Sequence, residues 1–215
     1  MKSSRLKPET LEASYRKRHE TVLKPLASAL ANHITDCFKG QSRIDRISAR
    51  PKDVSSFLTK ANKMGGRHRK YSEPLHQIQD QVGARIVTFY RSDVDCLDKI
   101  VGKYFRAIES KDHVPDSEWE FGYFGRHHIL VIPSDVIDDD WDKALVPKFF
   151  ELQIKTLFQH AWSEAEHDVG YKEGEKPLNL DQKRRLAFTS AQAWGADRVF
   201  DELFRELLAP ASKSN

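Results

Sequence analysis

The stretch Phe149-Phe-Glu-Leu-Gln-Ile-Lys-Thr156 alternates strictly between apolar and polar side chains. The apolar face would carry Phe150, Leu152 and Ile154, and the polar face would carry Glu151, Gln153 and Lys155. This period of two indicates a strand with one face on a core. The polar face presents an acid, an amide and a base in a row, a pattern that a solvent-facing strand also shows. Residues 160–168 follow at once and read as a helix rich in groups that hold or exchange protons, which favours a functional face.

The composition is that of an ordinary globular protein. The chain has 215 residues, of which 39% are hydrophobic and 31% charged, and we expect a single domain over 1–215. A net charge of +3 does not indicate a general polyanion binder, but the charges are unevenly placed. Residues 60–70 hold five Lys or Arg and no acid, whereas residues 135–142 hold five acids and no base.

Neither the cysteines nor the apolar segments indicate export or a membrane. Cys37 and Cys96 lack the spacing of a metal or redox site, and no apolar run follows Met1 as in a signal peptide. No uncharged apolar segment is long enough to cross a bilayer. We therefore expect a protein of the reducing cytoplasm.

The order of periodic segments predicts an α+β domain. We expect a helix over about 9–37, interrupted at Pro25, and a long final helix over about 181–208, with 209–215 as a disordered tail. In the final helix we expect these side chains to face inward: Leu186, Trp194, Val199, Leu203 and Leu207. Further strands are expected at 44–49, 82–90, 105–110 and 126–132, and further helices at 54–62, ended by Gly65-Gly66, and at 93–105. Because strands and helices do not alternate regularly, we predict a mixed sheet of about five strands wrapped by helices.

A phosphate-binding pattern lies in Arg50-x-Lys52-x-x-x-Ser56-x-x-x-Lys60. Ser56 and Lys60 are four residues apart and share one helix face near its start. A helix N-terminus with several cations and a hydroxyl suits a polyphosphate. A solvated basic helix end would look the same. The basic residues from 63 to 70 are expected to form an exposed loop.

Asp80 stands just before the apolar strand that contains Gly83 and Arg85. A turn or a cap is one role for this aspartate. The other is to hold Mg²⁺, which uses one or two carboxylates together with substrate phosphates. If Glu151 lies on a neighbouring strand, the two carboxylates could share one ion.

Two glycines bracket an aromatic pair in Gly122-Tyr123-Phe124-Gly125, just before a strand. Tyr123 could stack on a nucleotide base, or it could pack in an ordinary hairpin turn. His127 and His128 point to opposite faces of that strand, so at most one of them lies in a site.

The helix after the strand at 149–156 carries a polar stripe: His160, Glu164, His167 and Tyr171. The stripe is not an HExxH motif and lacks a third strong zinc ligand. We interpret it as a hydrogen-bonded face that supports the acid and the amide of the strand.

Taken together, these motifs resemble the synthetase domain of the RelA/SpoT family, particularly its small alarmone synthetases. The resemblance covers about 15–208 and is carried by five motifs in the family's order: 50–60, Asp80 with Gly83-Ala-Arg85, Gly122-Tyr123 with His127, Glu151-x-Gln153-Ile-Lys155-Thr156, and His160-Ala-Trp with Glu166-His167 and Tyr171-Lys172. It implies a nucleotidyltransferase-like alarmone synthetase fold. It also implies transfer of the β,γ-pyrophosphate of ATP to the 3′-hydroxyl of GDP or GTP, giving (p)ppGpp, with Mg²⁺ as cofactor.

The resemblance assigns roles to individual residues. ATP would be held by Arg50, Lys52, Ser56, Lys60, Arg69 and Arg85, with the 63–70 loop over its phosphates. Asp80 and Glu151 would be the catalytic acids. Asp80 would hold Mg²⁺, and Glu151 would be either a second metal contact or the base that takes the proton of the 3′-hydroxyl. The acceptor would be held by Tyr123, His127, Gln153 and Lys155.

Two departures from the family pattern leave the acceptor open. Lys155 stands where the family generally has arginine, and Trp119-Glu-Phe121 replaces a lysine and a small polar residue before Gly122. The alternatives are the same chemistry on the 3′ end of tRNA or on an adenosine nucleotide, as in toxins with a neutralising antitoxin protein, and a non-catalytic nucleotide- or RNA-binding module. The two carboxylates disfavour the binding module, because a polyanion binder gains nothing from them. A homo-oligomer is compatible with the sequence.

Overall fold

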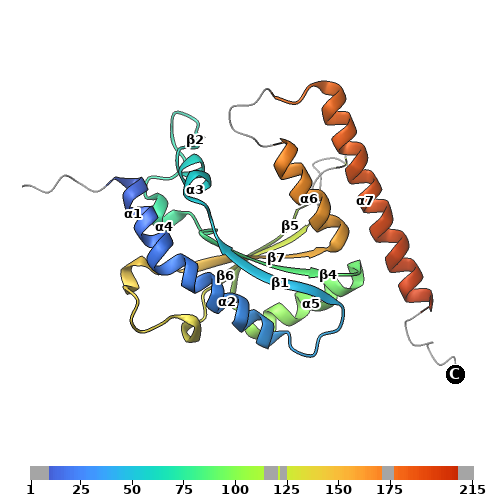
Figure 1. Cartoon of the computed structure of the whole chain (residues 1–215), viewed down its shortest axis with the longest axis horizontal. Helices are drawn as coiled ribbons and strands as arrows, with labels where there is room; N and C mark the ends of the chain where they lie inside the picture. The colour runs from blue at the N-terminus through green and yellow to red at the C-terminus, as the bar shows by residue number, and fades with distance from the viewer. Residues whose placement is uncertain (1–9, 114–120, 122–124, 171–176, 208–215) are drawn as a thin grey trace, which may run out of the picture.

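The computed structural model describes residues 10–113, 121, 125–170 and 177–207, and its centre is a five-stranded mixed sheet (Figure 1). The strands, in spatial order, are β1 (Ile44–Pro51), β4 (Val82–Thr88), β7 (Phe149–Thr156), β6 (Gly125–Val131) and β5 (Ala107–His113). β7 is central and parallel to β4, whereas all other neighbours in this sheet are antiparallel. The predicted mixed sheet of about five strands is confirmed.

Helices cover both faces of the sheet. The α-helices are α1 (Leu11–Arg18), α2 (Lys24–Cys37), α3 (Val54–Ala61), α4 (Pro74–Gln77), α5 (Arg91–Tyr104), α6 (Leu157–Gly170) and α7 (Leu180–Leu207). α2 and α5 lie on one face, and α6 lies over the other, with α7 packed beside it (Figure 1). Short 3₁₀ turns occur at Ser134–Val136 and Lys143–Leu145. None of the helices, within the described residues, is apolar over a length that would span a membrane.

The hydrophobic core lies between the sheet and the α2–α5 layer. Phe150, Leu152 and Ile154 of β7 are fully buried there, as their alternation predicts. Alternate residues of β4, Val82, Ala84 and Ile86, complete the same apolar face. The opposite face, which we call the open face, carries the polar positions of each strand.

The N-terminal helical segment begins after Thr10, whose side chain caps it, and continues to Cys37. It is interrupted by one π-helical turn, His19–Leu23, immediately before Pro25. Because proline has no N–H to donate to the preceding turn, the regular hydrogen-bond pattern changes at this point. The predicted interruption is therefore confirmed.

The helix predicted at 54–62 is confirmed as Val54–Ala61, but Gly65-Gly66 do not end it. The exposed loop expected after it contains a small hairpin of β2 (Met64–Gly65) and β3 (His68–Arg69). Gly66 has φ +72° in its turn, a conformation that favours glycine.

The orientation predicted for α7 was wrong for its second half. Val199, Leu203 and Leu207 are exposed, while Asp197 and Asp201 are buried. The carboxylates face the domain because each accepts a hydrogen bond there: Asp197 from Thr156 Oγ1 (2.7 Å) and Asp201 from the Ser92 amide (2.8 Å). Leu186 and Trp194 are partly buried. The predicted tail, 209–215, lies outside the described residues.

Candidate active site

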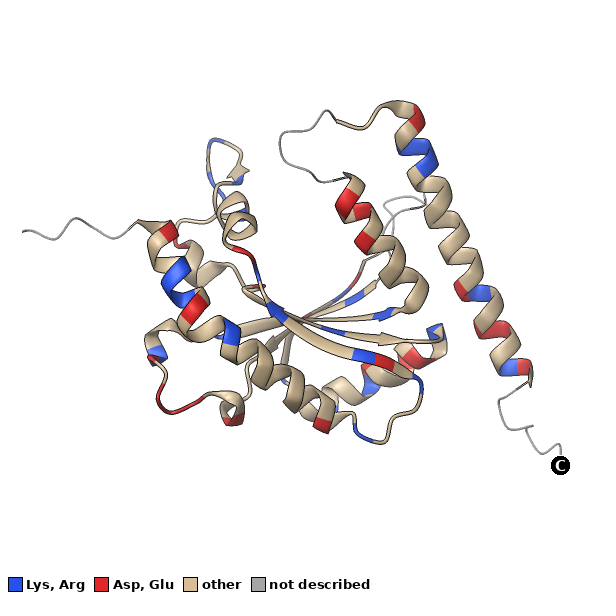
Figure 2. Ribbon diagram, in the orientation of Figure 1, with Lys and Arg blue, Asp and Glu red and all other residues tan. Residues whose placement is uncertain are grey.

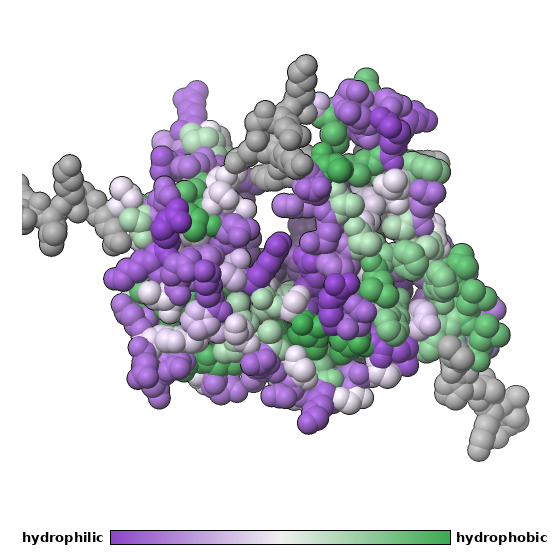
Figure 3. All heavy atoms as spheres, in the orientation of Figure 1, coloured by the Kyte–Doolittle hydropathy of each residue, from purple (hydrophilic) through white to green (hydrophobic). Residues whose placement is uncertain are grey.

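Polar residues from four neighbouring strands meet on the open face. Gly83 of β4 is paired with Arg50 of β1 and with Glu151 of β7, and Gln153 of β7 is paired with Arg85 and His127. Residues paired across strands point to the same side of a sheet. The structure thus brings five of the predicted site residues together. The space-filling view is hollowed between the β2–β3 hairpin and α6, and hydrophilic residues line the hollow (Figure 3).

Glu151 is held by two side chains at the centre of this face. His127 Nδ1 lies 2.9 Å from Glu151 Oε1, and Gln153 Nε2 donates to Oε2 at 2.8 Å. Burial raises the pKa of Glu151, but the contacts with His127 and Gln153 outweigh burial and bring that pKa below its ordinary value. Glu151 is therefore a carboxylate at neutral pH.

Asp80 lies just ahead of β4 and binds two of the predicted ATP-binding lysines. Its Oδ2 is 3.0 Å from Lys52 Nζ and 2.9 Å from Lys60 Nζ. Burial raises the pKa of Asp80, but the two ammonium groups outweigh it and lower the pKa. We call these three residues the Lys–Asp–Lys triad.

Of the two predicted metal-binding acids, Glu151 lies on β7 and Asp80 lies two residues before the neighbouring parallel strand β4. The negative charge of Asp80 acts to raise the pKa of Glu151, so the two carboxylates lie within electrostatic range. Asp80 Oδ1 is buried and accepts no hydrogen bond from the described residues, which leaves one oxygen available to a cation. No group of three or more His, Cys, Asp or Glu is placed to hold a metal within the part of the chain that the structure describes. The donor set fits Mg²⁺, which takes one or two carboxylates and completes its shell with water and phosphate.

Arg85 connects the open face to α6. Its Nη1 lies 2.7 Å from Glu164 Oε1 and 3.0 Å from His160 Nδ1. The polar stripe of α6 therefore contacts Arg85. The sequence had predicted that this stripe would support Glu151 and Gln153 of β7. Of the other stripe residues, His167 is exposed and Tyr171 lies outside the described residues.

Lys155 does not lie on the accessible part of the open face. It is 3% exposed, and its Nζ donates to Ser163 Oγ of α6 at 3.1 Å. Burial, reinforced by the charge of Arg85, lowers the pKa of Lys155 to about 7. α6 covers this end of β7, and the contact of Lys155 with the acceptor stays a prediction.

The other predicted residues lie at the rim of the site or outside the described residues. Ser56 is exposed in the first turn of α3, and Arg69 is exposed on β3. Basic residues are concentrated on the β2–β3 hairpin and along β1, as Figure 2 shows. Tyr123 lies outside the described residues.

Two further residues of the open face were missed from the sequence. The His113 ring lies 4.2 Å from the His127 ring, and Arg46 occupies the same side of β1 as Arg50. His113 was missed because the strand at 105–110 was ended three residues early. The alternation of Arg46, Ser48 and Arg50 would have revealed Arg46.

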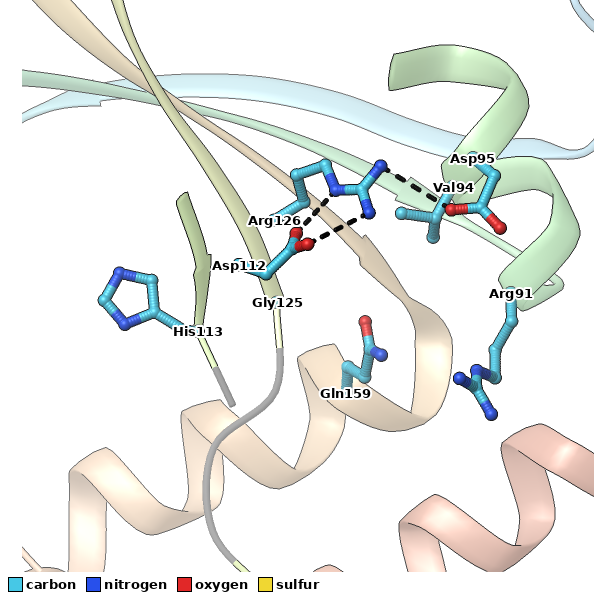
Figure 4. A pocket seen from close by; sticks show the side chains of 8 residues that line it. All are labelled: Arg91, Val94, Asp95, Asp112, His113, Gly125, Arg126 and Gln159. Carbon is cyan, nitrogen blue, oxygen red and sulfur yellow. Dashed lines mark hydrogen bonds and ion pairs between the residues drawn. The ribbon is translucent and has the colours of Figure 1, made fainter. Parts of the chain in front are cut away.

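A pocket of about 200 Å³ lies between the first turns of α5 and α6 and the ends of β5 and β6 (Figure 4). Its lining is Arg91, Val94, Asp95, Asp112, His113, Gly125, Arg126 and Gln159, none of which is a predicted site residue. Arg126 is bound at 2.7 Å by Asp112 and at 2.8 Å by Asp98. Because none of the predicted ATP-binding residues lines this pocket, we do not assign the phosphate site to it.

Comparison with known proteins agrees with this geometry. The family model described as "Region found in RelA / SpoT proteins" matches residues 49–176. GTP pyrophosphokinase YjbM of Bacillus subtilis is 30% identical over 172 residues, which are 77% of this chain and 74% of that protein.

Solved structures show the same fold. Small alarmone synthetase 1 from Bacillus subtilis, bound to its product pppGpp, superposes with a TM-score of 0.64 at 22% identity, covering 90% of this chain and 94% of that one. A GTP pyrophosphokinase family protein from Streptococcus pneumoniae gives a TM-score of 0.70 at 23% identity, covering 93% and 96%. The α+β fold is therefore that of the alarmone synthetases, and this chain belongs to the RelA/SpoT family.

Proposed function

We propose that this protein transfers the β,γ-pyrophosphate of ATP to the 3′-hydroxyl of GDP or GTP and so makes ppGpp or pppGpp. The observation that carries the proposal is the ionised Glu151, fixed by His127 and Gln153 beside a cationic surface. The names of the similar proteins, GTP pyrophosphokinases and alarmone synthetases, favour a guanosine acceptor over tRNA or an adenosine nucleotide.

The cationic residues bind and orient the polyphosphate of ATP. Arg50 and Arg85 lie on the open face, and Lys52 and Lys60 reach it from the end of β1 and from α3. Ser56 and Arg69 add a hydroxyl and a guanidinium at the rim. Phosphoryl transfer depends mainly on positioning and on neutralising charge, and this surface supplies both.

Glu151 removes the proton from the 3′-hydroxyl of the acceptor. Its two neighbours fix the plane of the carboxylate, and a carboxylate with one bond at each oxygen still has lone pairs for that proton. The proton is transferred to Glu151 as the hydroxyl oxygen bonds to the β-phosphorus of ATP and AMP leaves. Lowering the pKa of Glu151 keeps this base ionised at neutral pH.

Asp80 and Glu151 would hold Mg²⁺ through their oxygens. When bound, the ion neutralises charge on the transferred phosphates. Lys52 and Lys60, which neutralise Asp80 in the free protein, then bind the phosphates of ATP.

The acceptor is held on the β6 side of Glu151. His127 and Gln153 orient it through the carboxylate that they fix, and Tyr123 stacks on its base. Lys155, which Ser163 holds beneath α6, acts on the acceptor through its charge when it is protonated.

The test is to incubate the protein with ATP labelled in its γ-phosphate, with Mg²⁺, and with GDP, GTP, AMP or bulk tRNA in separate reactions. Label is expected in the products of GDP and GTP. If only tRNA or an adenosine nucleotide is labelled, that molecule is the acceptor in place of GDP and GTP. If no acceptor is labelled, the proposal is overturned.

A further inference from the structure

Helix α1 lies outside the segment that matches the family model, yet it reaches the phosphate-binding end of the site. Two of its side chains are buried although they are polar: Tyr15 is fully buried and Arg18 is 3% exposed. Both contact the chain segments that carry the Lys–Asp–Lys triad.

Tyr15 binds the main chain of Lys52. Its hydroxyl donates to the Lys52 carbonyl at 2.7 Å, and its ring stacks on Phe57 of α3 with centroids 3.6 Å apart and planes 3° apart. α3 is also the helix that carries Lys60. A single side chain of α1 therefore fixes both segments from which the two lysines extend. Burial raises the pKa of Tyr15, so the hydroxyl keeps its proton at any physiological pH.

Arg18 binds the segment that leads into Asp80. Its Nη1 donates to Gln81 Oε1 at 3.0 Å and to the Leu75 carbonyl at 2.6 Å. Gln81 is 1% exposed, and its Nε2 in turn donates to the carbonyls of Leu75 and Ile78, each at 2.9 Å. The Lys52 amide donates to the Gln81 carbonyl at 2.8 Å, which closes a hydrogen-bonded frame around the triad.

The environment of Arg18 supports a role in this frame. A buried guanidinium is costly, and a carboxylate usually compensates the cost. Arg18 forms no ion pair with any described residue, and burial lowers its pKa. Its hydrogen bonds go to oxygens of the segment before β4 and, more weakly, to the Ala144 carbonyl at 3.4 Å. An apolar side chain would fill the same space without that cost but would not hold Gln81.

We propose that Tyr15 and Arg18 are positioning residues for ATP, which set the separation of Lys52, Lys60 and Asp80 from beneath. The inference rests on the proposed function only in naming ATP as the ligand of the triad. It assigns to α1 a part in substrate binding that acts through the Lys–Asp–Lys triad.

The test measures the affinity of the full chain for a non-hydrolysable ATP analogue by calorimetry, together with the KM of ATP and of GDP. Tyr15→Phe removes one oxygen and keeps the ring that stacks on Phe57. We expect it to weaken analogue binding about three- to tenfold, the effect of one lost hydrogen bond, with the KM of GDP changed less than about twofold. Arg18→Met should weaken analogue binding at least as much.

Matched controls are Tyr104→Phe and Arg16→Met, which remove the same groups from exposed positions and should bind as the wild type does. A double-mutant cycle then tests the route. In a Lys52→Met background, Tyr15→Phe should add little, because its effect passes through Lys52.

Wild-type analogue affinity in Tyr15→Phe, or an equal loss for both substrates, would overturn the inference. So would an undiminished effect of Tyr15→Phe in the Lys52→Met background. If Arg18→Met does not fold, Tyr15→Phe alone decides. Failure of the proposed function is seen separately, as absence of transfer by wild-type protein that still binds the analogue.

Discussion

His127 and Glu151 lie on neighbouring antiparallel strands, with Nδ1 and Oε1 2.9 Å apart on the open face. This contact joins the residue predicted to hold the acceptor to the residue predicted to take its proton. Because Gln153 occupies the other oxygen of Glu151, the carboxylate has one orientation.

Glu151→Gln should abolish pyrophosphate transfer and leave the fold intact. The amide keeps the shape of the side chain but cannot accept the proton, and loss of a general base costs about 10²- to 10⁴-fold in rate. The measurements are the transfer rate and the thermal unfolding midpoint. Glu202→Gln, on the exposed side of α7, is the matched control. An unchanged turnover would remove Glu151 from the mechanism.

His127→Ala should move the acidic limb of the pH–rate profile to higher pH. His127 is the main partner that lowers the pKa of Glu151 against the effect of burial, so its loss lets that pKa rise. In the wild type, activity should persist to a pH below the ordinary glutamate range and fall as pH drops through the lowered pKa. The profile of kcat/KM for GDP is the measurement. An acidic limb at the same pH in both proteins would show that Glu151 does not set it.

Lys60→Met should weaken ATP binding and raise the pKa of Asp80. The substitution removes one of the two ammonium groups that neutralise Asp80, together with one phosphate contact. A charge-assisted hydrogen bond contributes about 1.5–3 kcal/mol, so we expect the KM of ATP to rise at least tenfold. Lys63→Met, three residues further along at an exposed position, should have a smaller effect. A larger rise in the KM of ATP for Lys63→Met than for Lys60→Met would place the phosphates over the hairpin and away from the triad.

Tyr123→Ala should impair use of the acceptor far more than binding of ATP. A stacked base contributes about 1–3 kcal/mol, which corresponds to a rise of about 5- to 150-fold in the KM of GDP. The measurement compares the KM values of the two substrates. An equal loss for both would mean that Tyr123 is structural.

Asp197→Asn should stabilise the protein at neutral pH. Burial raises the pKa of Asp197 to about 6, so the folded state binds its proton more tightly than the unfolded state does. The contribution of Asp197 to the free energy of unfolding is therefore greatest at a pH below the ordinary pKa of aspartate, and it declines as pH rises to about 6. The asparagine still accepts from Thr156 and carries no charge, which should add on the order of 2 kcal/mol at pH 7. Urea unfolding at pH 5 and pH 7 measures this, and a variant less stable than wild type at pH 7 would contradict it.

The sequence predicted the sheet well because alternation is local. The period of two in β7 and the apolar β4 identify both strands and the side of β7 that is buried. The partners of each strand could not be predicted, since pairing joins residues as far apart as Gly83 and Glu151. The convergence of the site residues on one face therefore required the structure.

The two failures at helices have a common physical cause. Alternation placed Lys155 on the open face, but α6, which follows β7 directly, covers that end of the strand. Helical periodicity placed Val199 and Leu203 inside, but Thr156 and the Ser92 amide bind Asp197 and Asp201 there instead. In both cases a tertiary contact, and not the local pattern of apolar residues, determined which side chains are buried.

The Lys–Asp–Lys triad has a consequence for the choice of anions. In the free protein each lysine already has a tethered counter-ion, so an incoming anion competes with Asp80 for both ammonium groups. A singly charged anion attracts the ammonium groups no more strongly than the carboxylate does. Its binding also costs translational entropy, which Asp80 does not lose because it is part of the chain. Under the proposed function, a polyphosphate with its own divalent cation would engage both lysines and would give Asp80 a new partner. The site would then discriminate against the abundant small anions of a cell and still accept a nucleoside triphosphate.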